Sequence, residues 1–544
     1  MEFYIILFLV MLFFFIMAAC NEKFKPKVGH QTSFTIILGI LIALILWGCF
    51  GDSRTDIYKF NQDIFFDFLL PPIILNSGFN MRRKKFFQNI GNVAIFGLGV
   101  TFVCFAIYSI ASYAAIKYGN LTMVNYYMNN EGLSGGGPIP IDIDFMRLLL
   151  FTALLCSSDV VAAVSIVSYE AQPKLYSCVF GEGVFNDIVS IILFNTVNSL
   201  QGSKFFWYTP FIIIGQFLLL GIISISVGLV FGALLSLLFK HVRFLTATPI
   251  VETFLIFSTC YVSYFVSNLI KLPNGLEMSG IISLLTCAIV SAHYTYYNIS
   301  PQGRQATTLS FSFLGEMAEA AVYSYIGIAL YSTIPTWWSW SFVFLQLAII
   351  VLGRICGVLS TFYCCRLCWK KKTIKFNELI FITYAGMIRG AIAFALVLKI
   401  QFDNEDGVPC PDCYSKKNYE LVVSTTLMLV MFTTLIFGTF MDITQKFLVP
   451  PKKVPLTASF ASMAVASHLR KNSEFGKSEY EEIVHPNEEK SVLSDSLSRR
   501  PSYLLGSQPV SWVNSAFVNW FINLDENRLR PWLIRNYTLQ NVMA

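Results

Sequence analysis

The chain has 544 residues, of which 55% are hydrophobic and only 13% are charged, with a mean hydropathy of +0.60 and a formal net charge of +6. A soluble protein of this length needs far more charge to cover its surface. The basic residues stand in short clusters beside apolar runs and not in an aromatic-interleaved patch, which argues against a nucleic-acid-binding protein.

Apolar runs recur along most of the chain, and a membrane-crossing helix needs about 20 such residues. The runs cover roughly 1–19, 33–50, 63–80, 88–116, 144–168, 176–199, 209–239, 249–270, 276–293, 306–332, 340–367, 376–399 and 419–441. The sequence therefore predicts an all-α polytopic membrane protein with about 13 transmembrane helices in residues 1–449. Residues 450–544 follow as a separate C-terminal tail.

Lysine and arginine clusters set the expected orientation, because inner loops are richer in these residues. With the N-terminus outside, the inner loops hold all the strong clusters, namely Lys23, Lys25, Lys27, Arg82, Arg83, Lys84, Lys85, Lys240, Arg243, Arg366, Lys370, Lys371, Lys372 and Lys375. A cleaved signal peptide ending near Ala18 and Ala19 would reverse every loop, and its start carries Glu2 without a basic residue. A retained first span and a cytosolic tail are therefore expected.

Three loop features fit this topology. Asn120 begins a glycosylation sequon in a long outer loop, and Cys410 and Cys413 lie in the last outer loop, either as a disulfide or as free thiols. Three cysteines at the inner face are either palmitoylation sites or ordinary packing residues: Cys364, Cys365 and Cys368.

The tail is polar and serine-rich between Arg470 and Arg500, which predicts a largely disordered cytosolic region open to regulators. An aromatic, partly amphipathic segment lies near 510–535. We expect this segment to dock either on a membrane surface or on the membrane domain.

Asp187 is the most informative charged residue, because it lies with Asn186 inside an apolar run. A buried carboxylate loses its hydration, so it must bind either a proton or a cation. One group that binds either ion, but not both, exchanges them across a membrane if its access alternates. The adjacent amide can supply an oxygen for a hard cation or orient the carboxylate. The alternative is a protonated aspartic acid that only joins two helices.

Two other runs contain signs of a helix break. Ser157, Ser158 and Asp159 stand in the middle of the fifth run, and glycines flank Arg389 in the twelfth. Interrupted helices at comparable positions of two halves are typical of inverted-repeat transporters, and their freed carbonyls can face an ion. Arg389 would offset the negative ends of the broken helices. Buried acids and Arg354 also predict an interhelical ion pair, with Glu182, Glu316 and Glu319 as the candidate acids.

Four segments together resemble the eukaryotic sodium/proton exchangers of the monovalent cation/proton antiporter superfamily. They are Phe68–Asn76, Val179–Asp187, Ala318–Gly327 and Arg389–Phe394. The resemblance implies an inverted-repeat antiporter fold with two discontinuous crossing helices, organised as a homodimer of dimerisation and six-helix core domains. It also implies Asp187 as the carrier of Na⁺ or K⁺ and H⁺, and the Asn-Asp pair implies electroneutral 1:1 exchange.

The same resemblance gives Asp159 and Ser158 a place at the unwound helix and Arg389 a place at the opposite break. It implies that Glu182 and Arg354 brace the core and that Glu319 supports it. The family's usual proline after the unwound aspartate is Val160 here, a departure at the position that borders the ion site. Asn76 replaces an acid of plasma-membrane members, as in endomembrane types, which favours an endosome, Golgi or vacuole.

The predicted function is therefore secondary antiport of Na⁺ or K⁺ against H⁺ across a lipid membrane. No nucleotide-binding loop, transition-metal cluster or nucleophile–base pair is evident in the sequence, so neither an enzyme nor a cofactor is expected. Two alternatives stay open: a transport-inactive ion or pH sensor or scaffold of the same fold, and a cation channel.

Overall fold

The computed structural model of the chain describes residues 2–24, 31–50, 62–81, 86, 90–125, 138–167, 172–201, 206–242, 244, 248–270, 278–333, 336–369, 375–402, 413–450, 520 and 523–535. The basic cluster Arg82–Lys85 and most of the C-terminal tail lie outside these residues.

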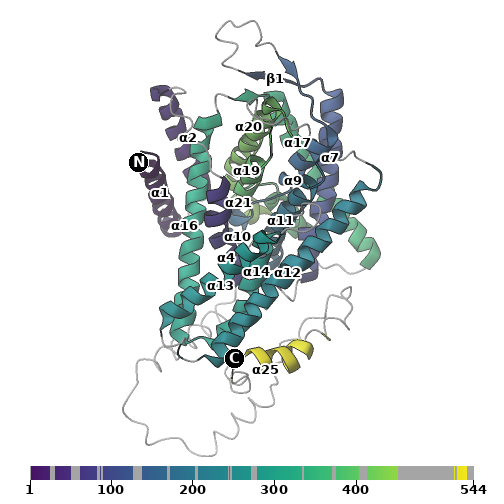
Figure 1. The fold of residues 1–544 in the computed structure, drawn as a ribbon. Helices are drawn as coiled ribbons and strands as arrows, with labels where there is room; N and C mark the ends of the chain where they lie inside the picture. Colours follow the sequence, from purple (N-terminus) through teal and green to yellow (C-terminus); the bar gives the residue numbers. More distant parts are fainter. Residues whose placement is uncertain are drawn as a thin grey trace, which may run out of the picture.

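Helices make up nearly all of the described chain (Figure 1). The longer ones are α1 (Glu2–Phe24), α2 (Gln31–Phe50), α4 (Leu70–Phe79), α7 (Val100–Tyr118), α9 (Phe145–Leu154), α11 (Pro173–Asn198), α12 (Thr209–His241), α13 (Pro249–Leu269), α14 (Gly280–Val290), α16 (Pro301–Thr333), α17 (Trp340–Trp369), α18 (Phe376–Ala385), α19 (Ala391–Leu398), α20 (Lys416–Thr433) and α21 (Met441–Leu448). The shorter ones are α3 (Gln62–Ile64), η2 (Phe65–Leu69), α6 (Ile90–Ala94), η3 (Ile95–Gly99), α10 (Val161–Ile166), η6 (Ser291–Thr295), α15 (Tyr296–Asn298), η7 (Thr434–Gly438), η8 (Asp525–Leu529) and α25 (Arg530–Leu533).

Seven of the described helices are long and apolar enough to cross a membrane: Gln31–Cys49, Ile90–Tyr118, Pro173–Ser199, Thr209–His241, Pro249–Leu269, Trp340–Cys364 and Lys416–Gly438. Several other expected crossings are divided into short helices. Pro71 and Pro72, for example, open α4 directly after the π-helical segment η2, because proline removes a backbone donor and disturbs the preceding turn. The expected count of about 13 is therefore not confirmed by helix length.

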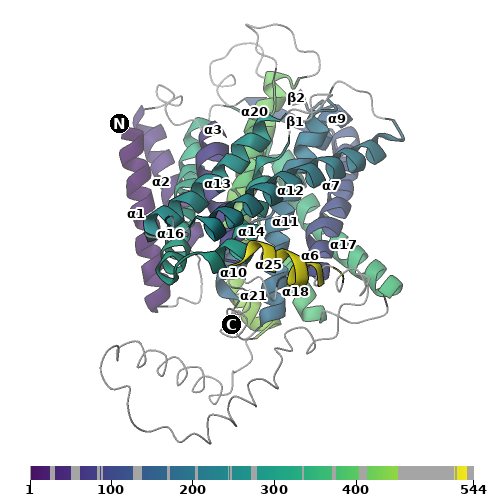
Figure 2. The same cartoon turned by 60° about the horizontal axis from the view of Figure 1, so that its bottom comes forward.

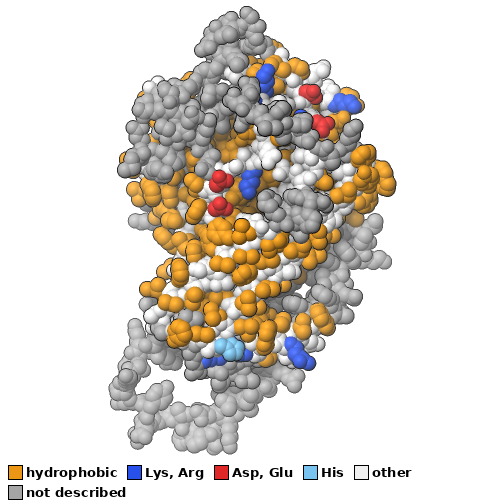
Figure 3. All heavy atoms as spheres, in the orientation of Figure 1, with side chains coloured by type: hydrophobic (Ala, Val, Ile, Leu, Met, Phe, Trp, Pro, Cys, Tyr) orange, Lys and Arg blue, Asp and Glu red, His pale blue; other side chains and the backbone are white. Residues whose placement is uncertain are grey.

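The face of the helical body seen in Figure 3 is largely hydrophobic where its residues are described. Large apolar side chains on α12 are among the exposed ones, including Phe211, Ile222 and Val230 at 69%, 64% and 56% exposure. An aqueous protein rarely leaves so many large apolar groups uncovered over a wide area. Lipid is the environment that accommodates this surface without cost.

The sequence did not predict a small antiparallel sheet at one end of the helices (Figure 1). Strand β1 (Thr122–Asn125) lies between β2 (Ile139–Pro140) and β3 (Trp337–Trp338), with Met123 opposite Ile139. Two of these strands have only two residues each, too few for a recognisable alternating pattern.

Loop residues with predicted modifications are described only in part. Asn120 is exposed and has a positive φ of 44°, a conformation that asparagine tolerates. Cys413 is disulfide-bonded, while Cys410 lies outside the described residues. Cys364 is a free, exposed thiol, and the side chains of Cys365 and Cys368 are outside the described set.

The C-terminal segment formed by η8 and α25 lies against the ends of α12 and η6, across from the sheet (Figures 1 and 2). Tyr294 Oη and Arg530 Nε donate hydrogen bonds of 2.6 and 2.8 Å to Asp525, and His293 Nε2 lies 3.3 Å from the same carboxyl. Asn298 Nδ2 donates to the carbonyl of Leu533 at 2.8 Å. The segment thus folds back onto the helical body.

Asp525 lies beyond the membrane-spanning helices, and its surroundings favour the charged form. Burial alone raises the pKa of this carboxyl, but the contacts with His293, Tyr294 and Arg530 more than offset it, so the pKa is lowered. A lowered pKa in the docked state means that the carboxylate stabilises docking above its ordinary pKa. This contribution is lost as the pH falls through the lowered value.

We predict that Asp525→Asn loosens this segment, because the amide cannot accept the same charge-assisted hydrogen bonds. The loss should be on the order of 2 kcal/mol, which accelerates amide hydrogen exchange in Leu529–Leu533 roughly 30-fold. The exposed neighbour Glu526 provides the control, since Glu526→Gln removes the same charge. Equal protection in wild type and Asp525→Asn would contradict the assignment.

Candidate functional site

Two interrupted helices meet in the middle of the molecule. The first break separates α9 from α10 at residues 155–160, and the second separates α18 from α19 at 386–390. The backbone N–H of Asp159 in the first break donates to the carbonyl of Ile388 in the second at 2.9 Å. Both predicted breaks are confirmed, and the first forms with Val160 in place of a proline.

Close approach of the two breaks depends on a glycine. A Cβ atom at Gly390 would lie 2.9 Å from the Cβ atom of Asp159, which is closer than real Cβ contacts. Thr433 Oγ1 of α20 accepts from the N–H of Arg389 at 3.0 Å, and Thr434 Oγ1 donates to its carbonyl at 3.1 Å. Side-chain hydroxyls therefore form the hydrogen bonds that the backbone N–H and C=O groups of Arg389 lack where the helix is interrupted.

The Arg389 side chain donates hydrogen bonds to the backbone carbonyls that follow the end of α9. Its Nη1 donates to the carbonyls of Cys156 and Ser157 at 3.2 and 2.8 Å, and its Nη2 donates to Tyr108 Oη at 2.9 Å. The side chain is 1% exposed. Carbonyls at a helix C-terminus carry partial negative charge, so a buried guanidinium both satisfies and neutralises them.

The Asn-Asp pair of α11 faces the first break. Ser157 Oγ donates to Asp187 Oδ1 at 2.6 Å, and Asn186 Nδ2 donates to Ser158 Oγ at 2.6 Å. Asn186 Oδ1 also accepts from Thr101 Oγ1 at 2.8 Å. Asn186 is completely buried, whereas Asp187 is half-buried. The amide is therefore held from both ends, while the carboxyl group keeps a free side.

A second carboxyl group lies at the same crossing. Asp159 is half-buried and accepts a hydrogen bond from Tyr323 Oη of α16. Glu319 lies one turn earlier on α16, and its Oε1 is buried without a hydrogen-bond partner. The structure thus brings Asp187, Asp159 and Glu319 to one region from three helical elements.

Glu182 and Arg354 form a buried ion pair between α11 and α17, with 0% and 1% exposure. Glu182 lies one helical turn before Asn186, so the pair fixes the helix that carries the candidate site. The guanidinium lies directly against Gly386, where any Cβ atom would collide with it. The predicted partnership of an acid in α11 with Arg354 is confirmed, and it also reaches the second break.

Three contributors were not singled out from the sequence: Thr101, Tyr108 and Tyr323. Thr101 and Tyr108 are seven residues apart on α7 and therefore share a helix face. Polar residues at this spacing in an apolar run are the signal that could have identified them. The sequence had indicated both hydroxyls of the first break, but not that Ser157 bonds to Asp187 and Ser158 to Asn186.

The site offers oxygen atoms from carboxyl, hydroxyl and backbone carbonyl groups. Hard cations such as alkali ions prefer oxygen ligands, whereas thiolate and imidazole suit transition metals. In the described part of the chain, no cluster of three or more His, Cys, Asp or Glu residues fits a metal ion. The chemistry of the donors therefore suits a hard cation or a proton.

Comparison with known proteins places this geometry in context. The family described as sodium/hydrogen exchanger, transmembrane, matches residues 5–445. An uncharacterised Na⁺/H⁺ antiporter of Schizosaccharomyces pombe is 29% identical over 421 residues, covering 76% of this chain and 67% of that protein. The endosomal/prevacuolar sodium/hydrogen exchanger of Saccharomyces cerevisiae is also 29% identical, over 76% of this chain and 62% of that protein.

Solved structures show the same fold. The sodium proton antiporter MjNhaP1 from Methanocaldococcus jannaschii superposes with a TM-score of 0.58 at 16% identity, covering 83% of this chain and 99% of that one. Sodium/hydrogen exchanger 4 of Arabidopsis thaliana is similar over a longer stretch of sequence, with 28% identity across 91% of this chain and 86% of that protein. Since the family match spans most of its length, this chain belongs to the sodium/hydrogen exchanger family.

Proposed function

We propose that this chain exchanges Na⁺ or K⁺ for H⁺ across a membrane, with Asp187 as the group that carries either ion. The hydrogen bond from Ser157 to Asp187 is the observation that supports this most directly. It joins the carboxyl group to the break in the first interrupted helix, where the hydroxyl groups of Ser157 and Ser158 and the carboxyl group of Asp159 supply further oxygen atoms. The family membership and the names of the relatives support exchange of these ions.

The proposed stoichiometry is one cation for one proton. Asn186 contributes no charge, and both ends of its amide are engaged by Thr101 and Ser158. Asp159 is held by Tyr323 and by its own backbone bond to Ile388. Asp187, which accepts its hydrogen bond from Ser157 in the first break, is the carboxyl group that we assign as exchangeable. A single exchangeable group transfers no net charge when its two cargoes each carry one.

Alternating access completes the proposal. The six-helix core would move as a unit braced by Glu182 and Arg354 and change the side of the membrane from which ions reach Asp187.

We propose thirteen crossings in total, with α9 and α10 together making one and α18 and α19 together making another. A homodimer, a cytosolic C-terminus and residence in an endosomal, Golgi or vacuolar membrane complete the assignment. The endosomal/prevacuolar location of the yeast relative supports the last point.

We predict that Asp187→Asn abolishes exchange, because the amide neither takes up a proton nor neutralises a cation. The measurement is pH-gradient-driven uptake of Na⁺ and K⁺ into proteoliposomes, with uptake expected to fall to that of protein-free vesicles. Asp67 offers a matched control: it is a half-buried carboxyl group of η2 that accepts from Tyr264 Oη at 3.1 Å. Asp67→Asn should retain exchange. Persisting exchange in Asp187→Asn would reject the site.

We predict that Glu182→Gln destabilises the protein by about 3 kcal/mol or more, since it leaves the guanidinium of Arg354 buried without its counter-ion. The readout is the thermal unfolding midpoint of the detergent-solubilised chain. The double variant with Arg354→Met removes both charges and should regain much of the lost stability. If the unfolding midpoint of the double variant is no higher than that of Glu182→Gln alone, loss of the ion pair is not the cause of the destabilisation.

A further inference from the structure

A stripe of polar side chains runs along α16 from its first turns to the crossing of the broken helices. The stripe consists of Gln305, Thr308, Ser312, Glu316, Glu319 and Tyr323. Intervals of three or four residues place all of them on one face of the helix. Tyr323 ends the stripe at the crossing, because its hydroxyl donates a hydrogen bond to Asp159. The other end lies next to the C-terminal segment, since Asn298, shortly before α16, donates to the Leu533 carbonyl.

The polar stripe becomes less exposed toward the crossing. Gln305, Thr308 and Glu316 are exposed. Glu319 is half-buried, and Tyr323 is only 4% exposed. The polar face of α16 is therefore open to its surroundings near the C-terminal segment and covered where it meets the crossing.

An apolar strip lies beside the polar stripe. Leu309, Phe313 and Met317 follow one another at four-residue intervals and are 73%, 58% and 36% exposed. Lipid accommodates these side chains, whereas an ionised carboxyl group such as that of Glu316 is expensive in hydrocarbon. The two faces of α16 therefore need different surroundings, and the polar stripe needs water.

Glu316 carries the exposed negative charge of this stripe. It lies two turns before Tyr323, which is about 10 Å along the helix axis. In the described part of the chain it forms no ion pair. Glu319 is close enough to both Glu316 and Asp159 for their charges to interact. Tyr323 is within the same range of Asp187, so acidic and hydroxyl oxygen atoms lead from Glu316 to the proposed ion carrier.

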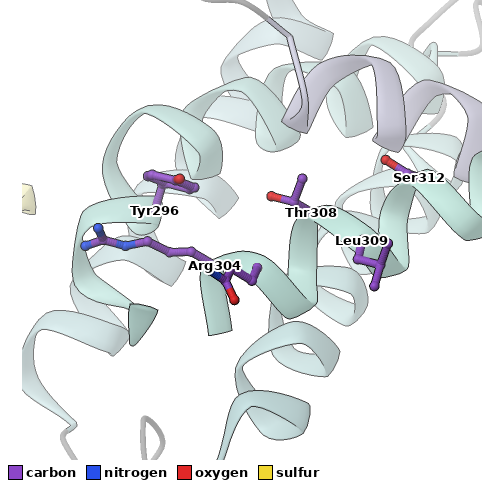
Figure 4. A pocket seen from close by; sticks show the side chains of 6 residues that line it. Tyr296, Arg304, Thr308, Leu309 and Ser312 are labelled. Atoms are coloured by element: carbon purple, nitrogen blue, oxygen red, sulfur yellow. The ribbon is translucent and has the colours of Figure 1, made fainter. Parts of the chain in front are cut away.

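The start of the stripe opens into a hollow of about 460 Å³ (Figure 4). Its lining consists of Tyr296, Arg304, Gln305, Thr308, Leu309 and Ser312. The guanidinium carbon of Arg304 lies 5.1 Å from the centroid of the Tyr296 ring, and its Nη2 donates to the Tyr297 carbonyl at 3.4 Å. Figure 4 shows this side chain turned away from Thr308 and Ser312. The positive charge of the hollow is therefore held away from the polar stripe.

We propose that Glu316 is the entry residue for the transported cation on the side of the membrane that carries the C-terminal segment. This inference rests on the proposed exchange at Asp187. A carboxylate in a polar path with low-dielectric walls attracts cations and raises their local concentration. From Glu316 the ion would pass Glu319 and reach the crossing. Glu316 then sets the cation concentration at which exchange from this side is half-maximal, while Asp187 sets the maximal rate.

The test measures sodium uptake into proteoliposomes that contain the full-length chain in one orientation. A peptide tag on the C-terminus allows vesicles that expose this end to be separated on affinity beads from the others. The sodium side is kept alkaline, because protons then compete least for Asp187. We expect Glu316→Gln to raise the KM for sodium about 3- to 10-fold in vesicles with the C-terminus outside, with an unchanged maximal rate. In vesicles with the C-terminus inside, the KM should stay that of wild type.

Two further variants of this position separate charge from shape. Glu316→Asp keeps the charge and should keep a KM close to that of wild type, whereas Glu316→Lys should raise the KM above that of Glu316→Gln. Added choline chloride should reduce the difference between wild type and Glu316→Gln, because salt screens the carboxylate. Glu526→Gln is the matched control, since it removes an exposed acid of η8 that lies outside α16, and it should leave the KM unchanged.

The outcomes separate this proposal from the proposed function. An unchanged KM in Glu316→Gln, an equal rise in both vesicle populations, or an equal rise in Glu526→Gln would overturn the role of Glu316 and leave exchange at Asp187 intact. Absence of exchange by the wild type would instead reject the proposed function, and the role of Glu316 with it.

Discussion

A helix that stops inside a membrane leaves backbone N–H and C=O groups that lipid cannot satisfy. This chain places two such interruptions against each other, so that each supplies partners for the other. The bond from Asp159 N–H to the Ile388 carbonyl joins them, and Arg389 closes the carbonyl end of α9. This mutual arrangement leaves Ser157 and Ser158 outside a helix, where they form hydrogen bonds with Asp187 and Asn186 of α11.

Rigid and exchangeable groups are separated around the crossing. Asn186, Arg389, Glu182 and Arg354 are almost fully buried and engaged by protein partners. Asp187 and Asp159 retain partial exposure. A buried ion pair is costly to break, so the pair of Glu182 and Arg354 suits a brace better than a carrier. The half-buried carboxyl of Asp187 suits a group that must meet ions from solution.

The sequence predicted those features that carry a local chemical signature. A carboxyl group in an apolar run identified Asp187, and small or polar residues within runs identified both breaks. It did not identify Tyr323 or Thr101, because their roles come from contacts with residues 164 and 85 positions away. It also did not predict the sheet, because two of its three strands have only two residues and show no periodicity. Helix length did not confirm thirteen crossings, because prolines and breaks divide several of the expected helices.

Competition between a cation and a proton for one carboxyl group is the central claim, and proton release tests it most directly. Sodium chloride is added to the purified chain in weakly buffered detergent solution while the pH is recorded, with choline chloride as the ionic-strength control. We expect sodium to release up to one proton per chain from the wild type and none from Asp187→Asn. Sodium binding without proton release, or equal release from the variant, would contradict the account.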